Sequence, residues 1–238
     1  MKQGIIIGAS SGIGWELAVQ LAAQGYQLGL MARRDGCLKK LADSLPGQHF
    51  VQVTDLVNAE RAQADLTSLI EKMGDVELIV VNSGVGSMER LLDWEVERQM
   101  VDVNVRGFTA MSLTSMNHFV ARGGGHLVGV SSVAAHLSGG ISLTYNASKA
   151  YVSNYLEGMR SRALRSKLPI TVTTVEPGFV ETPMVQGRPP WMSSVEKATA
   201  QMVTAINKKK NHVFVTRRWR FVALLVDIMP RALIRRFV

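Results

Sequence analysis

Gly8-Ala9-Ser10-Ser11-Gly12-Ile13-Gly14 is the stretch that decides the fold, because it joins an apolar run, Gly4–Ile7, to a segment with helical spacing, Ile13–Gln24. Glycine has no side chain, so backbone N–H groups in such a turn can approach a phosphate, and the positive end of the following helix stabilises its charge. The alternative is a tight turn that only packs well. The spacing G-x-x-x-G-x-G is a variant of the G-x-G-x-x-G fingerprint of dinucleotide-binding proteins.

The alternation of strand and helix continues along the chain. The candidate strands are continuously apolar runs, as is typical of parallel strands covered on both faces: Gly4–Ile7, Gln27–Ala32, Phe50–Val53, Leu78–Asn82, His126–Val130, Thr171–Val175 and His212–Val215. The candidate helices are Ile13–Gln24, Leu38–Leu45, Ala59–Met73, Val96–Phe119, Tyr145–Leu164 and Val195–Asn207. Right-handed crossovers then predict an α/β fold of the Rossmann type, a doubly wound, seven-stranded parallel sheet flanked by helices, with a short helical C-terminal tail.

The chain is expected to form one domain, because the alternation runs through its 238 residues without a low-complexity linker. We expect a dinucleotide-binding domain at residues 1–216 and a basic amphipathic helical tail at 217–238. Within the domain, the irregular stretch 178–194 follows a strand end and is predicted to be a lid. The aromatic and methionine side chains of this lid are Phe179, Met184, Trp191 and Met192, a plausible apolar cover for a substrate.

Composition excludes several classes of protein. Cys37 is the only cysteine, so no intrachain disulfide can form. No window reaches the roughly 18 uninterrupted apolar residues of a spanning helix, and the apolar stretch after Met1 is too short for a secretory signal. His118, His126 and His136 lack metal-ligand spacing, so we expect no metal. A cytoplasmic location is expected.

The net charge of +8 belongs to the C-terminal part of the chain. Residues 208–238 carry nine Lys/Arg and the single acid Asp227, whereas the rest holds equal numbers of basic and acidic side chains. This balance argues against a broad nucleic-acid-binding surface, and no nucleic-acid partner is expected.

Two arginines occupy the position whose side chain distinguishes NAD-binding from NADP-binding proteins. About 20 residues after the glycine-rich turn, an acid would bond the ribose hydroxyls of NAD, but here the chain has Arg33 and Arg34. A guanidinium, that of Arg33 first, can pair with the 2′-phosphate of NADP. Alternatively, both are solvated residues opening the next helix, with Asp35 near enough to neutralise one. NADP is favoured and NAD is less expected.

Tyr145 and Lys149 lie four residues apart at the start of a candidate helix, so they share one face. A nearby ammonium favours the phenolate, which predicts that Lys149 lowers the pKa of Tyr145 towards the range useful for proton transfer. This pair alone is weak evidence. Three further motifs follow candidate strands and strengthen it: Asn82-Ser83-Gly84, Ser131-Ser132 and Pro177-Gly178.

Taken together, these motifs resemble the classical short-chain dehydrogenase/reductase family, in order from Gly8 to Thr182. The resemblance implies that Ser132 bonds the substrate oxygen, Tyr145 exchanges its proton, and Lys149 binds the nicotinamide ribose and lowers the pKa of Tyr145. It also implies that Asn104 completes a catalytic tetrad by holding a water that links Lys149 to solvent. From the residues alone, Asn104 would be a buried helix-packing asparagine.

The resemblance also implies a set of cofactor-binding residues. Asp55 would lie near the adenine, Asn82 and Gly84 beside the adenosine ribose, and Val180 and Thr182 at the nicotinamide carboxamide. The whole set is Gly8, Ser10, Ser11, Gly12, Ile13, Gly14, Arg33, Arg34, Asp55, Leu56, Asn82, Gly84, Tyr145, Lys149, Pro177, Gly178, Val180 and Thr182. One departure is Ser83, where the family usually has alanine; serine is also small, so little effect is expected.

The tail after Thr216 reads as two short helical pieces broken at Pro230, each with arginines beside apolar side chains. Such a segment can lie in the headgroup region of an anionic membrane, here at the inner face. The competing interpretations are packing on a sister subunit, since the family commonly forms homodimers or homotetramers, and a roof over the active site.

The sequence thus predicts an NADP-dependent short-chain oxidoreductase that interconverts a carbonyl and an alcohol on an apolar small molecule, with Tyr145 as acid or base. One alternative is a 3-ketoacyl thioester reductase, which the same tetrad would serve. An alternative of another class is a non-catalytic NADP-binding sensor or scaffold anchored by its tail.

Overall fold

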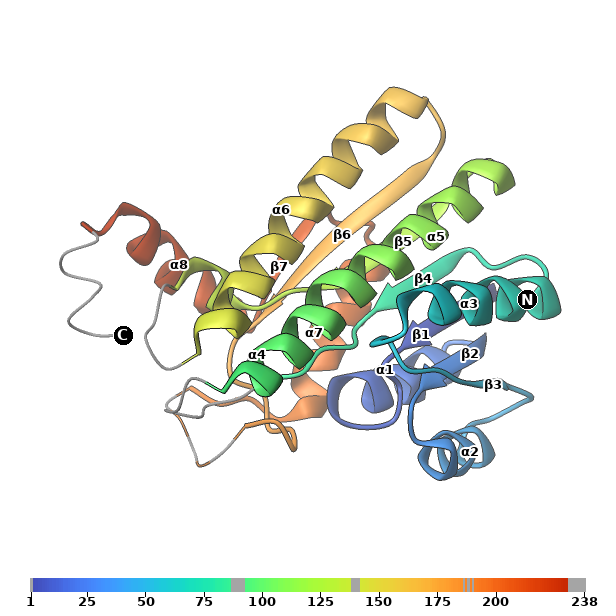
Figure 1. Ribbon diagram of the computed structural model, residues 1–238. Helices are drawn as coiled ribbons and strands as arrows, with labels where there is room; N and C mark the ends of the chain where they lie inside the picture. Colours follow the sequence, from blue (N-terminus) through green and yellow to red (C-terminus); the bar gives the residue numbers. More distant parts are fainter. Residues whose placement is uncertain are drawn as a thin grey trace.

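The computed structural model describes residues 2–86, 93–137, 142–185, 187, 189 and 191–230. These residues form one parallel sheet of seven strands (Figure 1), which confirms the predicted fold class. The strands are β1 (Lys2–Ile7), β2 (Tyr26–Ala32), β3 (Phe50–Val53), β4 (Leu78–Val81), β5 (Gly125–Val130), β6 (Ile170–Pro177) and β7 (His212–Val215). The α-helices are α1 (Gly12–Ala22), α2 (Asp35–Ser44), α3 (Ala59–Met73), α4 (Trp94–Val101), α5 (Phe108–Arg122), α6 (Leu143–Ser166), α7 (Val195–Asn207) and α8 (Trp219–Ile228).

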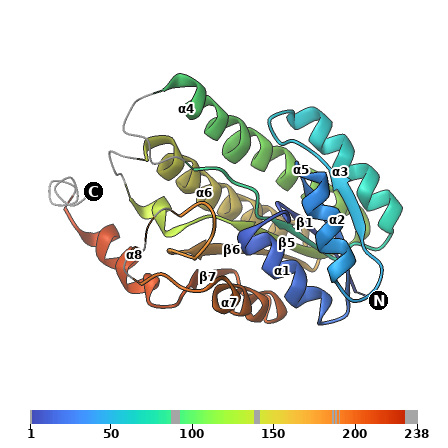
Figure 2. The ribbon, with the colours of Figure 1, turned by 90° about the horizontal axis from the view of Figure 1, so that it is seen from below.

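Helices cover both faces of the sheet (Figure 2), which is why the strands read as continuous apolar runs. One face packs against α3, α5 and α6, and the other against α1, α2 and α7. Ile5 and Ile7 point into the first layer and Ile6 into the second, and all three are 0% exposed. The two cores hold the strand ends in place, and these ends carry the functional residues.

The strand order is β3-β2-β1-β4-β5-β6-β7, so the direction of winding reverses at β1. This strand pairs in parallel with β2 on one side and with β4 on the other. In open α/β sheets, ligands bind outside the carboxyl ends of the strands at such a point. The glycine-rich turn after β1 lies there.

One predicted helix contains an irregularity that the periodicity does not show. The periodicity predicts a continuous helix over Val96–Phe119, whereas the chain forms a π-helical segment, Asp102–Gly107, between α4 and α5. Asn104 within this segment bonds the backbone of Val85, which is 19 residues away in the sequence. Helical periodicity cannot register a contact over that distance, and segments of this kind occur frequently at functional sites.

The other predicted elements lie where the sequence places them, with ends that differ by up to three residues. In the tail, α8 covers the first predicted helical piece, while the second, 231–238, lies outside the described residues. Across the part of the chain that the structure describes, no helix combines the length and apolar character needed to cross a bilayer.

Candidate functional site

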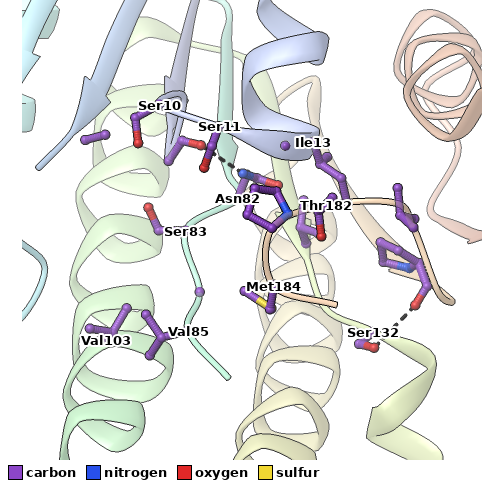
Figure 3. A pocket seen from close by; sticks show the side chains of 18 of the residues that line it. Ser10, Ser11, Ile13, Asn82, Ser83, Val85, Val103, Ser132, Thr182 and Met184 are labelled. Atoms are coloured by element: carbon purple, nitrogen blue, oxygen red, sulfur yellow. Dashed lines mark hydrogen bonds between the residues drawn. The ribbon is translucent and has the colours of Figure 1, made fainter. Parts of the chain in front are cut away.

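A cleft lies at the carboxyl ends of the central strands, and most of the predicted site residues line it (Figure 3). Those residues are Gly8, Ser10, Ser11, Gly12, Ile13, Arg33, Arg34, Asp55, Leu56, Asn82, Gly84, Ser132, Tyr145, Lys149, Pro177, Gly178, Val180 and Thr182. Pro183, Met184 and Val185 of the predicted lid also line the cleft, as do Ser83 and Ser131 of the quoted motifs. The sequence reasoning missed the remaining lining residues, all of them close to a motif: Ala32, Thr54, Val85, Val103 and Val130. Gly14 and Asn104, both predicted, are not among the lining residues.

The turn after β1 is held by backbone bonds to the neighbouring strands. Gly8 donates its N–H to the Met31 carbonyl at 2.7 Å, and its own carbonyl accepts from Asn82 Nδ2 at 3.1 Å. Gly8 has φ +93°, and a Cβ there would lie 2.7 Å from the Ser83 nitrogen, so only glycine fits. The predicted Asn82 thus shapes this turn from the adjacent strand.

The first turn of α1 presents unpaired N–H groups to the cleft. Ser11 stands at the N-cap, yet its side chain makes no capping hydrogen bond, and the first turn holds no acid. The hydroxyl of Ser11 instead accepts from Arg34 Nη2 at 2.7 Å, and Ser10 accepts from the same nitrogen at 2.9 Å. The arginine therefore adds positive charge beside donors that already favour an anion.

Gly14 contributes to packing and not to the cleft lining. A Cβ at this position would overlap the carbonyl oxygen of Gly8 and come within 2.7 Å of Asn82 Nδ2. The absence of a side chain lets α1 approach the end of β1 closely. The third glycine of the motif is therefore needed for contact between helix and strand.

The predicted catalytic side chains meet at the other end of the cleft. The side chain of Ser132 lies near enough to that of Tyr145 to influence its pKa, and Ser132 Oγ donates to the Pro177 carbonyl at 3.3 Å. Lys149 is 5% exposed, and its Nζ donates to the Val130 carbonyl at 3.0 Å while lying 5.7 Å from the centre of the Tyr145 ring. The two hydroxyl groups and the ammonium group thus lie together at this end of the cleft.

The electrostatics of this group differ from the sequence-based prediction. Burial raises the pKa of Tyr145, and the hydrogen bond with Ser132 only partly opposes it. Burial also lowers the pKa of Lys149 to about 8. The expectation that the ammonium lowers the pKa of Tyr145 is wrong for the protein alone, because Lys149 points at the Val130 carbonyl and burial disfavours both charges.

Asn104 is 1% exposed, and its amide is bonded within the protein. Its Oδ1 accepts from the Val85 N–H at 2.8 Å, and its Nδ2 donates to the Val85 carbonyl at 2.8 Å and to Ser148 Oγ at 3.1 Å. A Cβ on Gly84 would lie 3.5 Å from Asn104 Oδ1 and 3.2 Å from Lys149 Nζ. The side chain therefore fixes the loop after β4 beside Lys149.

The predicted lid forms one rim of the cleft, within the part of 178–194 that the structure describes. Val180 forms an isolated bridge with Ser193, which closes the base of the loop. Trp219 of α8 is buried against this base, with ring centres 5.6 Å from Phe179 and 5.7 Å from Trp191. The tail helix is thereby connected to the cleft rim.

The residues present fit an extended dinucleotide. Glycines and unpaired helix N–H groups form the middle of the cleft, Arg33 and Arg34 stand at one end, and the Ser132, Tyr145 and Lys149 group stands at the other. Pyrophosphate suits the first environment and a nicotinamide ribose the last. Within the described ranges, no group of three or more His, Cys, Asp or Glu side chains is arranged to hold a metal ion.

Comparisons with known proteins agree with this geometry. The family model of short chain dehydrogenases matches residues 2–193. An uncharacterized oxidoreductase of Mycobacterium tuberculosis is 32% identical over 245 residues, which cover 98% of this chain and 96% of that protein. An uncharacterized oxidoreductase of Myxococcus xanthus is 35% identical over 188 residues, covering 76% of this chain and 73% of that protein.

Solved structures share the fold. A short chain dehydrogenase of Burkholderia cenocepacia in complex with NADP has a TM-score of 0.82 and 23% identity, covering 98% of this chain and 97% of that one. A short chain dehydrogenase/reductase of Burkholderia phymatum in complex with NAD has a TM-score of 0.86 and 22% identity, covering 94% and 92%. The chain therefore belongs to the short-chain dehydrogenase/reductase family and is an oxidoreductase acting on CH–OH or C=O groups.

Proposed function

We propose that the enzyme interconverts a carbonyl and an alcohol on an apolar small molecule with NADP as cofactor. The observation that carries this proposal is that Ser132, Tyr145 and Lys149 line the same cleft as the glycine-rich turn. Residues 1–216 would act as the dinucleotide-binding and catalytic unit.

The proposed chemistry assigns proton transfer to Tyr145. A nicotinamide dinucleotide supplies or accepts the hydride when bound. Burial raises the pKa of Tyr145, so its hydroxyl keeps its proton at neutral pH and can give it to a carbonyl oxygen. Ser132 would bond the same oxygen, and Lys149 would bind the nicotinamide ribose.

The proposed preference for NADP rests on Arg33 and Arg34, both exposed at the cleft. Relatives in fold include one complex with NADP and one with NAD, so the arginines of this chain carry the argument. Replacing Arg33 by alanine should weaken NADPH binding about 10- to 100-fold, the worth of a charge-assisted hydrogen bond, and leave NADH binding unchanged. Fluorescence titration measures both, and Lys40→Ala on α2 is the control; equal loss for NADH and NADPH would contradict the preference.

The proposed substrate is apolar because Val180, Met184 and Val185 line the same cleft as Tyr145. A second candidate, a 3-ketoacyl thioester, is favoured by exposed Arg217, Arg218 and Arg220 beyond β7, which could receive an acidic carrier protein. A substrate panel distinguishes the two.

The test is NADPH oxidation and NADP reduction over ketones, aldehydes, steroids, acyl thioesters and alcohols, with two matched variants. Tyr145→Phe should abolish turnover and keep NADPH binding. Tyr151→Phe, on the same helix, should retain turnover, because the Tyr151 hydroxyl contacts Thr109 at 2.7 Å and does not line the cleft. Tight NADPH binding without turnover on any compound would instead support a sensor or scaffold.

We also propose that α8 contacts an anionic membrane at its inner face. Its side chains Phe221 and Ile228 are 74% and 72% exposed, and Leu224 and Leu225 share that face. Flotation with phosphatidylglycerol vesicles should be lost on Phe221→Glu. It should be retained on Leu164→Glu, a control 77% exposed on α6. Equal flotation of both variants, or none for the intact chain, would leave packing on a sister subunit as the role of α8. Assembly as a homodimer or homotetramer and a cytoplasmic location also stay predictions.

A further inference from the structure

At the end of β6, a buried glutamate stands directly before a residue that lines the cleft. The side chain of Glu176 is 3% exposed and does not line the cleft. The next residue, Pro177, does line it, and its carbonyl accepts the Ser132 hydroxyl. A buried carboxylate is costly unless its oxygens are hydrogen-bonded, so its partners indicate its role.

Three donors from three different elements bond this carboxylate. Oε2 accepts from Nε2 of His136 at 2.9 Å and from Nε2 of His212 at 3.2 Å, and Oε1 accepts the Ser153 hydroxyl at 2.7 Å. The ring of Phe214 packs on both imidazoles, with centroid distances of 5.9 and 4.6 Å. Burial acts to raise the pKa of Glu176, but the three hydrogen bonds outweigh it and lower the pKa to about 2.

The bond from His136 ties the segment that carries Ser132. A 3₁₀ turn, Val133–His136, starts directly after Ser132, and none of its four residues is buried. The turn is therefore only partly covered by the rest of the protein. The contact between His136 and Glu176 anchors its far end to the end of β6.

The bond from Ser153 ties the helix that carries Tyr145 and Lys149. Ser153 lies one turn after Lys149 on α6, and its hydroxyl is 2.7 Å from Ser131 Oγ. Ser131 in turn donates to the Lys149 carbonyl at 2.8 Å. Polar contacts thus run from Glu176 to both elements that bear the proposed catalytic groups.

We propose that Glu176 is a positioning residue that holds the Ser132 turn and α6 against each other, and so sets the approach of the Ser132 and Tyr145 hydroxyls. It touches neither substrate nor cofactor and transfers no proton. The inference rests on the proposed roles of Ser132 and Tyr145. A misplacement of about 1 Å can lower a rate on the order of 100-fold, so such a residue affects kcat without contacting the reacting atoms.

A matched pair of histidine variants tests this proposal. His136→Phe and His212→Phe each remove one hydrogen-bond donor to the same Glu176 oxygen and keep a ring beside Phe214. They differ in location: His136 ends the turn that follows Ser132, whereas His212 lies on β7, which contributes no residue to the cleft. With NADPH and the best carbonyl substrate of the panel, His136→Phe should lower kcat on the order of 10- to 100-fold. It should leave the Kd for NADPH within twofold, and His212→Phe should stay within threefold in kcat.

Glu176→Gln separates position from charge. A glutamine can offer its oxygen to the two imidazoles and its amide N–H to Ser153, whose hydroxyl then bonds Ser131. Glu176→Gln should therefore retain most of kcat and the pH profile of the wild type. Glu176→Ala should lose as much kcat as His136→Phe does. All rates are expressed per NADPH-binding site, so a loss of folded protein does not count as a loss of kcat.

Two results would overturn the proposal. One is a kcat for His136→Phe equal to that of His212→Phe. The other is a loss in Glu176→Gln as large as in Glu176→Ala, which would make the charge itself the active feature. Should Glu176→Ala fail to fold, Ser153→Ala takes its place and should lower kcat in the same way. Full turnover in Tyr145→Phe would instead contradict the proposed function and is distinguishable from both results.

Discussion

Loss of stability in mild acid should depend on one buried imidazole, that of His126 on β5. The residue is 7% exposed, and its Nε2 lies 2.7 Å from Thr173 Oγ1. The Thr173 hydroxyl donates to the Lys210 carbonyl, so the imidazole must be the donor in the first contact. Burial lowers the pKa of His126 from 6.5 to about 4, with a smaller contribution from the charge of Lys209.

The direction of the effect follows from this lowered pKa. The unfolded chain binds a proton near pH 6.5 and the folded chain only near pH 4, so the contribution of His126 to stability is complete above pH 6.5 and is lost as the pH falls towards 4. Between pH 7 and pH 5 this linkage removes about 2 kcal/mol from the free energy of unfolding.

The perturbation is His126→Gln, which keeps an N–H donor for Thr173 and cannot titrate. Urea unfolding at pH 7 and pH 5 should show a pH-dependent loss about 2 kcal/mol smaller in the variant than in the wild type. Lys209→Gln should also reduce the loss, by a smaller amount. Equal losses in wild type and His126→Gln would refute the reasoning.

Three glycine substitutions give further predictions. Gly14→Ala places a methyl group on the Gly8 carbonyl, so NADPH affinity and melting temperature should both fall; unchanged binding in a titration would contradict the packing role of Gly14. Gly178→Ala overlaps the Trp219 indole, so α8 should detach and tryptic cleavage at Arg217 should quicken at unchanged melting temperature of the domain; wild-type cleavage would show that α8 is held elsewhere. Gly158→Ala on α6 meets nothing within 4 Å, so it should raise the free energy of unfolding by up to about 1 kcal/mol in urea, and a decrease would indicate an unseen contact.

The fold could be predicted from sequence because it rests on local patterns. Continuous apolar runs indicate strands covered on both faces, and the glycine-rich stretch after Ile7 indicates how the first strand meets the first helix. The helix predicted over Val96–Phe119 is present, but its π-helical segment was not foreseen; there a polar side chain, Asn104, bonds a distant backbone. Local periodicity carries no information about such a partner.

The candidate site could be predicted only as far as motifs reach. Ser132 is indicated by its position after a strand, and Tyr145 and Lys149 by their spacing on one helix face. The pKa of Tyr145 nevertheless moves opposite to expectation, because burial raises it more than the contact with Ser132 lowers it. Glu176 was missed because its partners lie 23 to 40 residues away, although an acid at the end of an apolar strand was a usable signal.

The π-helical segment Asp102–Gly107 depends on the number of residues in this stretch as well as on their types. A π-helical segment takes more residues per turn than an α-helix, so deleting one residue here would restore ordinary winding and leave the helices on either side nearly in place. The amide of Asn104 would then swing away from Val85 and Ser148, with every neighbouring side chain intact. This stretch should tolerate exchanges of residue type better than insertions or deletions, so in this segment the count of residues is part of the information that specifies the site.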